Sequence, residues 1–277
     1  MDCKKALTAT EGDMDKAIDW LREKGIAKAA KKEGRIAAEG LTRVATEGNT
    51  AVLFEVNSET DFVAKNEQFL GLLDTIQAAL LANKPADLDA TNAIVTENGT
   101  IADLIVSATA TIGEKISLRR VKVVEKTDDQ FFGAYMHNGG KISALVVLGG
   151  KEDATVAKNI AMQIASMKPE YVSQKDIPAA IVEAEKELQM RMMEQDPKLA
   201  GKPEKVLAGI LQGKVSKHFQ DVCLMDQEYF LGDKQKVSQF LKEVQANVVS
   251  FTRYETGEGI EKRVDNFAEE VMAQIKG

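Results

Sequence analysis

Residues 51–66 read AVLFEVNSETDFVAKN, and within this stretch an apolar, β-branched run gives way to a helical pattern. The run Ala51–Val56 and the earlier run Leu41–Ala45 flank the dipeptide Gly48-Asn49. Two short alternating runs on either side of such a dipeptide are typical of a β-hairpin. We therefore expect two paired strands that end where the helical pattern starts.

The helical pattern opens with Ser58 and Asp61, which have the spacing of a helix-capping box. We expect the helix itself to run from about Thr60 to Leu81. Its apolar stripe repeats at helical spacing and consists of Phe62, Phe69, Leu73, Ile76 and Leu80. Periodicity alone favours burial of Phe62 and a capping role for Asp61.

The same unit occurs a second time at an offset of 93 positions. This offset places Gly40 on Gly133 and residues 63–66 (VAKN) on residues 156–159 (VAKN) without a gap. The strands that would complete the two sheets are residues 115–125 and 247–255. We therefore expect an α+β protein with two duplicated halves, each an antiparallel sheet with helices on one face.

The N-terminal residues 1–25 have a helical pattern, in which Asp13 is a candidate cap and Gly25 a candidate end. Two short helices cannot enclose a core, so we expect this module to be incomplete and to lack a preceding helix. Residues 22–35 carry six basic and two acidic side chains. They are interpreted as a connector, either a solvated linker or a docking patch.

Two strongly helical stretches interrupt the second half. Residues 178–195 align Ile181, Leu188 and Met192, and residues 204–219 follow after a segment rich in proline and glycine. The apolar stripe of the latter is Leu207, Leu211, Val215 and Phe219. This pattern predicts a protruding helical hairpin.

Composition excludes several classes of function. The chain has 36 basic and 43 acidic residues, a net charge of −7, which argues against direct binding of nucleic acid. Two cysteines and two histidines without metal-ligand spacing argue against a zinc site. Neither a phosphate-binding loop nor a dinucleotide fingerprint is present, so we expect no cofactor. The absence of a long apolar run predicts a cytoplasmic protein without membrane contact.

These exclusions favour a binding protein over an enzyme. Two alternatives from the residues alone are a passive interaction or chaperone-like module, which would bind a partner without changing its nucleotide kinetics, and a carboxylate-dependent metal hydrolase. The latter would require a divalent ion bound by the isolated chain.

Four stretches, in order along almost the whole chain, carry a family resemblance. They are MDCKKAL at 1–7, TDFVAKN at 60–66, IGEKI at 112–116 followed by Arg119-Arg120, and GEGIEK at 257–262. Together they resemble the bacterial elongation factor Ts family. The resemblance implies a guanine-nucleotide exchange factor, which is not an enzyme of covalent chemistry and which binds elongation factor Tu in its GDP-bound and nucleotide-free states.

The resemblance also implies the site residues. Thr60, Asp61, Phe62 and Val63 match the segment that disturbs the Mg²⁺ site of elongation factor Tu, so Phe62 would be exposed rather than buried. Weaker matches to partner-contacting positions are Met1, Ile112, His137, Phe230 and Leu231. At the last two, this chain reads Gln227-Glu228-Tyr229-Phe230 where the family commonly has Gln-Pro-Phe-Val.

The domain organisation implied by the family refines the one predicted from patterning. Residues 1–35 would hold an incomplete module like a ubiquitin-associated domain, with its basic linker. Residues 36–126 would form the first core subdomain, and residues 127–177 with 220–262 the second. Residues 178–219 would form a coiled-coil hairpin and residues 263–277 a C-terminal helix.

Overall fold

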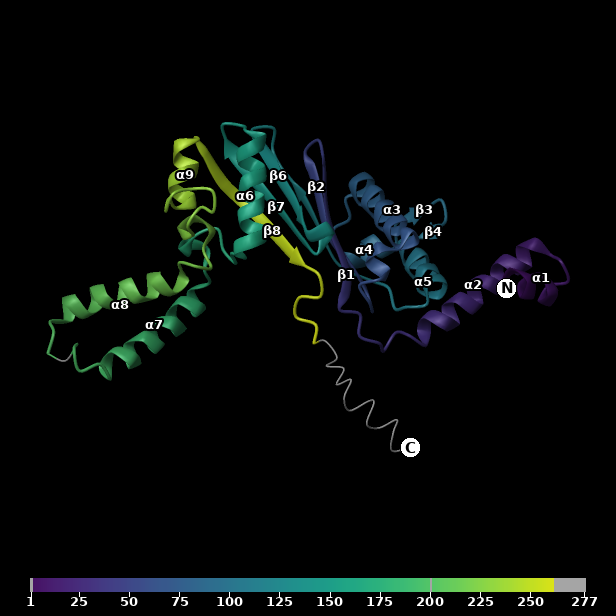
Figure 1. Cartoon of the computed structure of the whole chain (residues 1–277), viewed down its shortest axis with the longest axis horizontal. Helices are drawn as coiled ribbons and strands as arrows, with labels where there is room; N and C mark the ends of the chain where they lie inside the picture. Colours follow the sequence, from purple (N-terminus) through teal and green to yellow (C-terminus); the bar gives the residue numbers. More distant parts are fainter. Residues whose placement is uncertain (1, 200, 262–277) are drawn as a thin grey trace, which may run out of the picture. The chain divides into compact units, whose positions relative to one another are not determined.

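A computed structural model describes residues 2–199 and 201–261 (Figure 1). Met1 and the helix expected over residues 263–277 lie outside these residues. The chain divides into two units, which are described separately. The first comprises residues 1–125, 136–143 and the C-terminal part from 254, and the second comprises residues 126–135 and 144–253. Both combine helices with sheets, so the fold is α+β.

The first unit contains a three-stranded sheet in the order β1-β2-β5 and a two-stranded sheet, β3-β4. Its elements are α1 (Asp2–Ala9), α2 (Met14–Ala30), β1 (Glu39–Glu47), β2 (Thr50–Ser58), the 3₁₀ turn η1 (Val63–Lys65), α3 (Glu67–Asn83), α4 (Leu88–Asn92), β3 (Val95–Thr96), β4 (Gly99–Thr100), α5 (Ile101–Ile112), β5 (Ser117–Glu125) and the 3₁₀ turn η2 (Asn138–Gly140).

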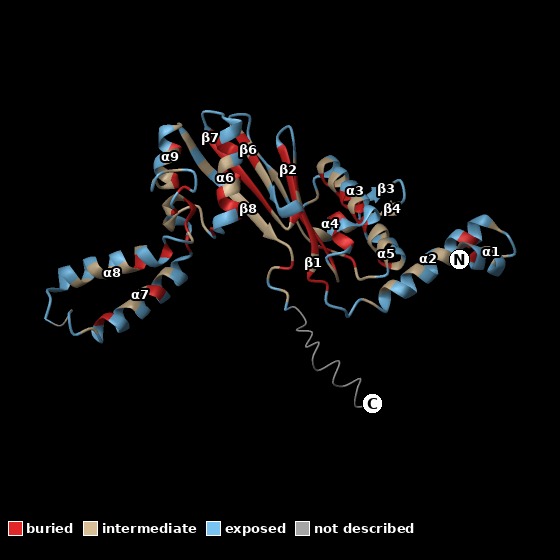
Figure 2. Cartoon of the chain, in the orientation of Figure 1, coloured by how far each residue is buried: buried red, intermediate tan, exposed pale blue. Residues whose placement is uncertain are grey.

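The predicted hairpin is confirmed. Glu47 pairs with Thr50 in an antiparallel register, so only Gly48 and Asn49 form the turn, and Gly48 has a φ of +55° that suits glycine. All nine residues of β2 are buried because β2 is the central strand (Figure 2).

The core of the first unit forms where α3 and α5 pack on this sheet. The residues that α3 contributes to this core are Phe69, Leu73, Ile76 and Leu80, and all four are fully buried. The predicted apolar stripe is therefore confirmed from Phe69 onward. These side chains contact apolar residues of β2 such as Phe54 and Val56. Full burial of one large apolar side chain stabilises a fold by about 1.5–3 kcal/mol, so this stripe holds α3 on the sheet.

The predicted start of this helix was wrong. The helix begins at Glu67 because Asn66 caps it: Asn66 Oδ1 accepts hydrogen bonds from Gln68 N at 2.8 Å and Phe69 N at 3.3 Å. Ser58 Oγ instead donates to the carbonyl of Thr60, so the predicted capping box of Ser58 and Asp61 does not form. Residues 59–66 therefore lie outside α3.

At the N-terminus, Asp13 caps α2 as predicted, with its carboxylate accepting a hydrogen bond from Lys16 N at 3.0 Å. The predicted end at Gly25 was wrong, because α2 continues to Ala30. A Cβ at Gly25 would lie 3.6 Å from Ala110 Cβ of α5. Gly25 is thus a helical residue that faces α5, and the basic connector is helical over its first half.

The second unit repeats the order of elements of the first. Its elements are β6 (Gln130–His137), β7 (Ile142–Gly150), α6 (Ala154–Met167), the 3₁₀ turn η3 (Gln174–Asp176), α7 (Ala179–Glu194), α8 (Glu204–Phe219), the 3₁₀ turn η4 (Leu224–Asp226), α9 (Val237–Glu243) and β8 (Ala246–Glu255). The strand order β6-β7-β8 matches β1-β2-β5 at equivalent places in the sequence. Asp153 caps α6, accepting hydrogen bonds from Thr155 N at 2.8 Å and Val156 N at 3.1 Å.

The helices α7 and α8 lie side by side (Figure 1). As predicted for α8, its residues Val215 and Phe219 are buried. In α7 the aligned side chains Ile181, Leu188 and Met192 are 44%, 44% and 51% exposed. The buried face of α7 is a neighbouring one that includes Glu185 and Met193. There Glu185 Oε1 accepts a hydrogen bond from Gln189 Nε2 at 2.7 Å, so a polar residue occupies a position that apolar periodicity does not predict.

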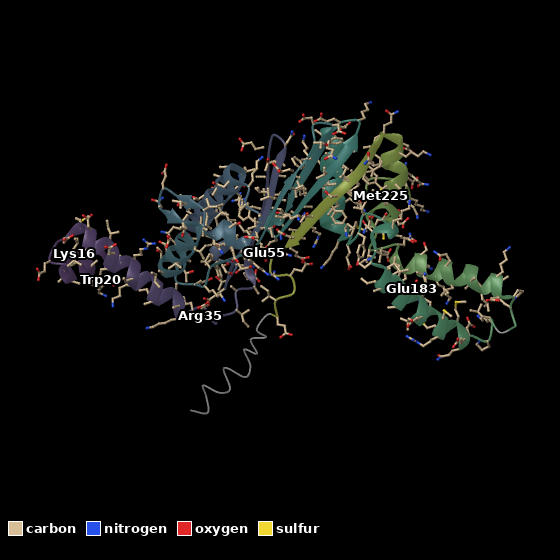
Figure 3. The ribbon with its side chains drawn as sticks, turned by 180° about the vertical axis from the view of Figure 1, so that it is seen from behind. Lys16, Trp20, Arg35, Glu55, Glu183 and Met225 are labelled. Carbon is tan, nitrogen blue, oxygen red and sulfur yellow. The ribbon has the colours of Figure 1, made fainter. Side chains whose placement is uncertain are left out.

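A buried carboxylate joins three segments of the first unit. Glu55 of β2 is fully buried and accepts hydrogen bonds from Arg120 Nε at 2.5 Å, Arg119 Nη1 at 3.2 Å and the backbone N–H of Gly257 at 2.7 Å (Figure 3). Both arginines also donate to backbone carbonyls of residues 255–258. Gly257 has a φ of +72°, and a Cβ there would lie 2.1 Å from the carbonyl oxygen of Ala38, so this close approach requires glycine.

Replacement of this carboxylate should be strongly destabilising. In Glu55→Ala, Arg119 and Arg120 lose their buried counter-charge, and we expect a loss of about 3–5 kcal/mol in the free energy of unfolding. The matched control is Glu125→Ala, which removes an exposed ion pair with Lys84 and should cost no more than about 1 kcal/mol. Urea unfolding followed by circular dichroism measures both, and equal losses would contradict the role of Glu55.

Candidate protein-binding site

The segment between β2 and α3 carries an exposed aromatic side chain. We call residues 59–62 the tip loop. Phe62 is 81% exposed and Asp61 is also exposed, whereas Val63 and Ala64, which follow at once, are buried in the core. The tip loop therefore presents its last two residues to solvent immediately before the chain returns to the core.

Side-chain hydrogen bonds from two other segments hold the base of the tip loop. Glu114 accepts a hydrogen bond from Thr60 Oγ1 at 2.6 Å through Oε1 and one from Thr60 N at 2.9 Å through Oε2. In the other direction, Glu59 Oε1 accepts hydrogen bonds from Lys115 N at 2.6 Å and from Arg35 Nη1 at 3.3 Å. We call the mutual bonds between residues 59–60 and 114–115 the clamp.

The end of α5 places Glu114 within reach of Thr60. Ile112, the last residue of α5, packs half-buried against the core of the first unit. Gly113 ends the helix with a φ of +91°, and its N–H donates to the carbonyl of Thr109 at 3.2 Å. Of the predicted site residues, the structure thus brings Ile112 to the chain segment that holds Thr60.

The burial of Phe62 predicted from periodicity was wrong, and the exposure implied by the family resemblance is observed. Residues 63–65 form a separate 3₁₀ turn, and Asn66 restarts the helix. The spacing of seven between Phe62 and Phe69 therefore spans a break, and the two side chains do not share a helix face. Val63 takes the inward position instead.

The second repeat shows what an uninterrupted helix start looks like at the equivalent place. At the offset of 93 positions, Thr60 corresponds to Asp153, which caps α6 directly so that this helix begins at Ala154. Thr60 instead turns its hydroxyl toward Glu114. The helix of the first repeat therefore starts six residues later than the offset predicts, which is nearly two turns. Asp61 and Phe62 of the tip loop, η1 and the cap Asn66 occupy the difference.

The remaining predicted site residues lie elsewhere. His137 is exposed at the end of β6, and Met1 lies outside the described residues. In the second unit, Phe230 and Leu231 are 39% and 59% exposed.

Phe230 and Leu231 lie on a loop whose position depends on buried residues that the sequence did not single out. Gln163 of α6 is fully buried, accepts a hydrogen bond from Phe230 N at 3.0 Å and donates one to the carbonyl of Glu228 at 3.1 Å. Tyr229 is buried and stacks on Phe240 with ring centroids 4.1 Å apart, and burial raises the pKa of its phenol above the ordinary value. A lone glutamine on the apolar face of α6 was the signal available in the sequence.

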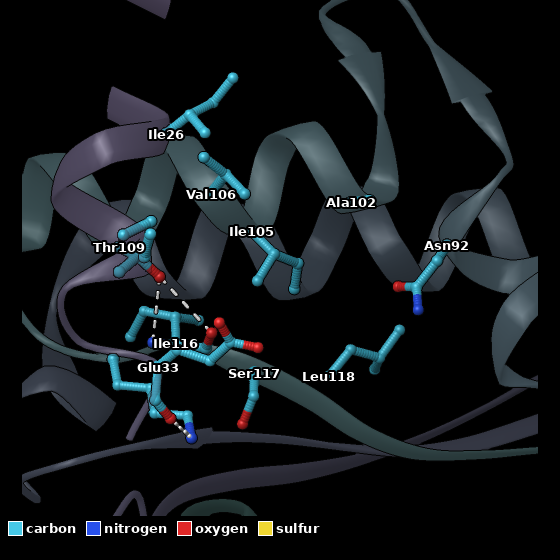
Figure 4. A pocket seen from close by; sticks show the side chains of 13 residues that line it. Ile26, Glu33, Asn92, Ala102, Ile105, Val106, Thr109, Ile116, Ser117 and Leu118 are labelled. Atoms are coloured by element: carbon cyan, nitrogen blue, oxygen red, sulfur yellow. Dashed lines mark hydrogen bonds between the residues drawn. The ribbon is translucent and has the colours of Figure 1, made fainter. Parts of the chain in front are cut away.

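The described residues do not form a catalytic or metal centre. No three His, Cys, Asp or Glu side chains among them converge on one point. A groove of about 490 Å³ between α2, α5 and β5 is lined mainly by aliphatic residues such as Ile26, Ile105 and Ile116, without the tip loop (Figure 4). No helix within residues 2–199 and 201–261 is long and apolar enough to cross a membrane.

The fold and this site define an α+β protein with an exposed aromatic side chain on the loop between β2 and α3. The family model for elongation factor Ts matches residues 59–258, which include the tip loop, the clamp and most of both repeats. The chain belongs to the elongation factor Ts family. Membership makes it a translation elongation factor of protein biosynthesis, a nucleotide-exchange factor rather than a catalyst of covalent chemistry, and implies elongation factor Tu as its partner.

The exposure of Phe62 predicts a clear difference from the other phenylalanine of the predicted stripe. Because the Phe62 side chain makes little contact with the fold, Phe62→Ala should change the free energy of unfolding by less than about 0.5 kcal/mol. Phe69→Ala opens a cavity in the core and should cost about 3–5 kcal/mol. Urea unfolding compares them, and a large loss in Phe62→Ala would show that its ring is packed in solution.

Proposed function

We propose that this protein binds the GDP-bound form of elongation factor Tu, disturbs its Mg²⁺ and phosphate site through the tip loop, and so promotes release of GDP for GTP loading. The observation that carries the proposal is the exposed pair Asp61-Phe62 on a loop anchored at both ends. Thr60 and Val63 are the anchors, and Asp61 and Phe62 are the groups that contact the partner.

An exposed aromatic ring on a fixed loop suits a protein interface. Aromatic side chains contribute more binding free energy than most residue types when they enter a partner's pocket. Because the clamp and the buried Val63 already order the loop, little conformational entropy is lost on binding. Phe62 is therefore the anchor of the interface, and Asp61 brings a negative charge to the same place.

The exchange mechanism is reciprocal linkage and needs no bond-breaking by this chain. A protein that binds the nucleotide-free partner more tightly than the GDP-bound partner must weaken GDP binding by the same factor. The Mg²⁺ ion in such a site requires near-octahedral coordination shared between protein and phosphate oxygens. A small displacement of the elements around the ion therefore lowers the affinity for GDP markedly.

Other contacts extend the interface away from the tip loop. We assign weaker contacts to Met1, Ile112, His137, Phe230 and Leu231. Ile112 is half-buried, so only part of its side chain can reach a partner, whereas Leu231 is more than half exposed. The replacement of the common Gln-Pro-Phe-Val by Gln-Glu-Tyr-Phe leaves Phe230 as the exposed ring and Tyr229 in the interior.

We further assign residues 1–35 to a helical module of the ubiquitin-associated type with its linker, and residues 36–126 and 127–177 with 220–262 to two core subdomains. Residues 178–219 form a coiled-coil hairpin. The contacts of α1 with α2 and of α7 with α8 support these assignments. The protein acts in the cytoplasm without direct contact with nucleic acid or membrane, in keeping with its net negative charge.

Stopped-flow release of a fluorescent GDP from elongation factor Tu tests the proposal. The parent chain should accelerate release, and both Asp61→Ala and Phe62→Ala should lower the accelerated rate about tenfold or more, since loss of one interface anchor costs at least 1.4 kcal/mol. Thr155→Ala is the matched control, because Thr155 is exposed and occupies the position of Phe62 in the second repeat. It should leave the rate unchanged.

Two outcomes would contradict the proposal. If the parent chain binds elongation factor Tu without accelerating GDP release, the protein is a passive interaction module. If Thr155→Ala lowers the rate as much as Phe62→Ala does, exchange does not depend on the tip loop. Circular dichroism of each variant excludes loss of fold as the cause.

A further inference from the structure

The clamp continues the pairing of β2 with β5 beyond the ends of both strands. In the ladder, Val56 pairs with Leu118 and Asn57 with Ser117 in an antiparallel register. Extension of this register by two and three positions places Glu59 opposite Lys115 and Thr60 opposite Glu114. These are the residues that the clamp joins.

Side-chain carboxylates replace backbone carbonyls in this extension. In a strand ladder, the N–H of each paired residue donates to a carbonyl of the opposite strand. Here the N–H of Lys115 donates to the Glu59 carboxylate, and the N–H of Thr60 donates to the Glu114 carboxylate. A glutamate carboxylate lies farther from its own backbone than a carbonyl oxygen does. The two backbones can therefore separate here while both N–H groups keep a hydrogen-bond acceptor.

Glu114 is itself held in place from both sides. Ile112 packs on the core before it, and Ile116, which is buried, follows it. The N–H of Ile116 donates to Thr109 Oγ1 at 3.1 Å, and Lys115 Nζ donates to the carbonyl of Glu33 (Figure 4). The carboxylate thus extends from a rigid segment toward a loop that has no strand or helix of its own.

We propose that Glu114 is a positioning residue, which fixes Thr60 and thereby directs Asp61 and Phe62 toward the partner. The functional part of this inference rests on the proposed function of the tip loop. Only Asp61 and Phe62 lie between Thr60 and the buried Val63. With Thr60 fixed, this short span has two anchored ends, and without Glu114 it has one.

The conservative and the disruptive variant of Glu114 should behave differently. Glu114→Ala removes both bonds to Thr60. In Glu114→Gln, the amide oxygen can accept from the Thr60 N–H while the amide nitrogen donates to the Thr60 hydroxyl, so both bonds persist without the charge. Asp153→Ala is the matched control, because it also removes two hydrogen bonds of a side chain, at the position that corresponds to Thr60 in the second repeat.

Hydrogen exchange of the Thr60 amide in the free protein tests the clamp without any partner. We expect exchange at least tenfold faster in Glu114→Ala than in the parent, and close to the parental rate in Glu114→Gln and Asp153→Ala. An unchanged rate in Glu114→Ala would overturn the clamp, whatever the protein binds.

GDP release from elongation factor Tu at saturating concentrations of this chain tests the consequence. We expect the maximal release rate to fall about tenfold in Glu114→Ala. This is the effect of a loop that adopts its exchange-competent orientation about a tenth of the time. The half-saturating concentration of this chain should change less. Glu114→Gln and Asp153→Ala should retain the parental rate.

The outcomes separate the two ideas. Faster Thr60 exchange combined with a parental release rate in Glu114→Ala overturns the positioning role and leaves the proposed function intact. A parent chain that fails to accelerate release overturns the proposed function and the positioning role together, while the Thr60 exchange rate still decides whether the clamp exists.

Discussion

The first unit depends on the fully buried carboxylate of Glu55. In the middle of β2 this charge is stabilised because Arg119, Arg120, the Gly257 N–H and the side-chain amide of Asn57 all donate hydrogen bonds to it. An unpaired buried charge is among the least favourable groups in a protein interior, so these segments must assemble together or not at all. The interaction joins the central strand, its β5 neighbour and a segment from the other end of the chain. It lies where the register between β2 and β5 shifts by one residue, between Glu55 and Val56.

The same two strands are linked again where they end. From Glu55 the chain reaches Thr60 in five residues, and back from Arg119 it reaches Glu114 in five. A charged cross-link inside the sheet and a carboxylate clamp beyond it therefore constrain one pair of segments at two points. The break between η1 and α3 then leaves Phe62 outside the core. The exposed aromatic ring therefore lies on a short span that is held at one end by the hydrogen bonds of Thr60 to Glu114 and at the other by the buried Val63.

Local patterning predicted the hairpin, the apolar stripe from Phe69 to Leu80 and the limits of α8, since each depends on residues close together in the sequence. The predicted burial of Phe62 was wrong. Its spacing of seven from Phe69 fits a continuous helix, but the helix begins only after Asn66. Patterning also failed for Gly25, because the usual helix-ending role of glycine was overridden by packing against α5. In α7 the most apolar face is not the buried one. The role of Glu114 was beyond local patterning, since its partner Thr60 lies 54 positions away.

A comparison of the two repeats shows how one of them has an exposed loop without an added helix or strand. Both have a hairpin, a helix and a third strand in the same order, and both carry Val-Ala-Lys-Asn at the same offset. In the second repeat, an aspartate at position 153 satisfies the first N–H groups of the helix, so the chain enters α6 directly. In the first repeat, the equivalent Thr60 binds a glutamate from another segment, and the capping role passes to Asn66. Because an N-cap fixes where a helix begins, this exchange of partners shifts the helix start by about two turns relative to the second repeat. Of the residues in between, Asp61 and Phe62 are exposed, whereas Val63 and Ala64 are buried.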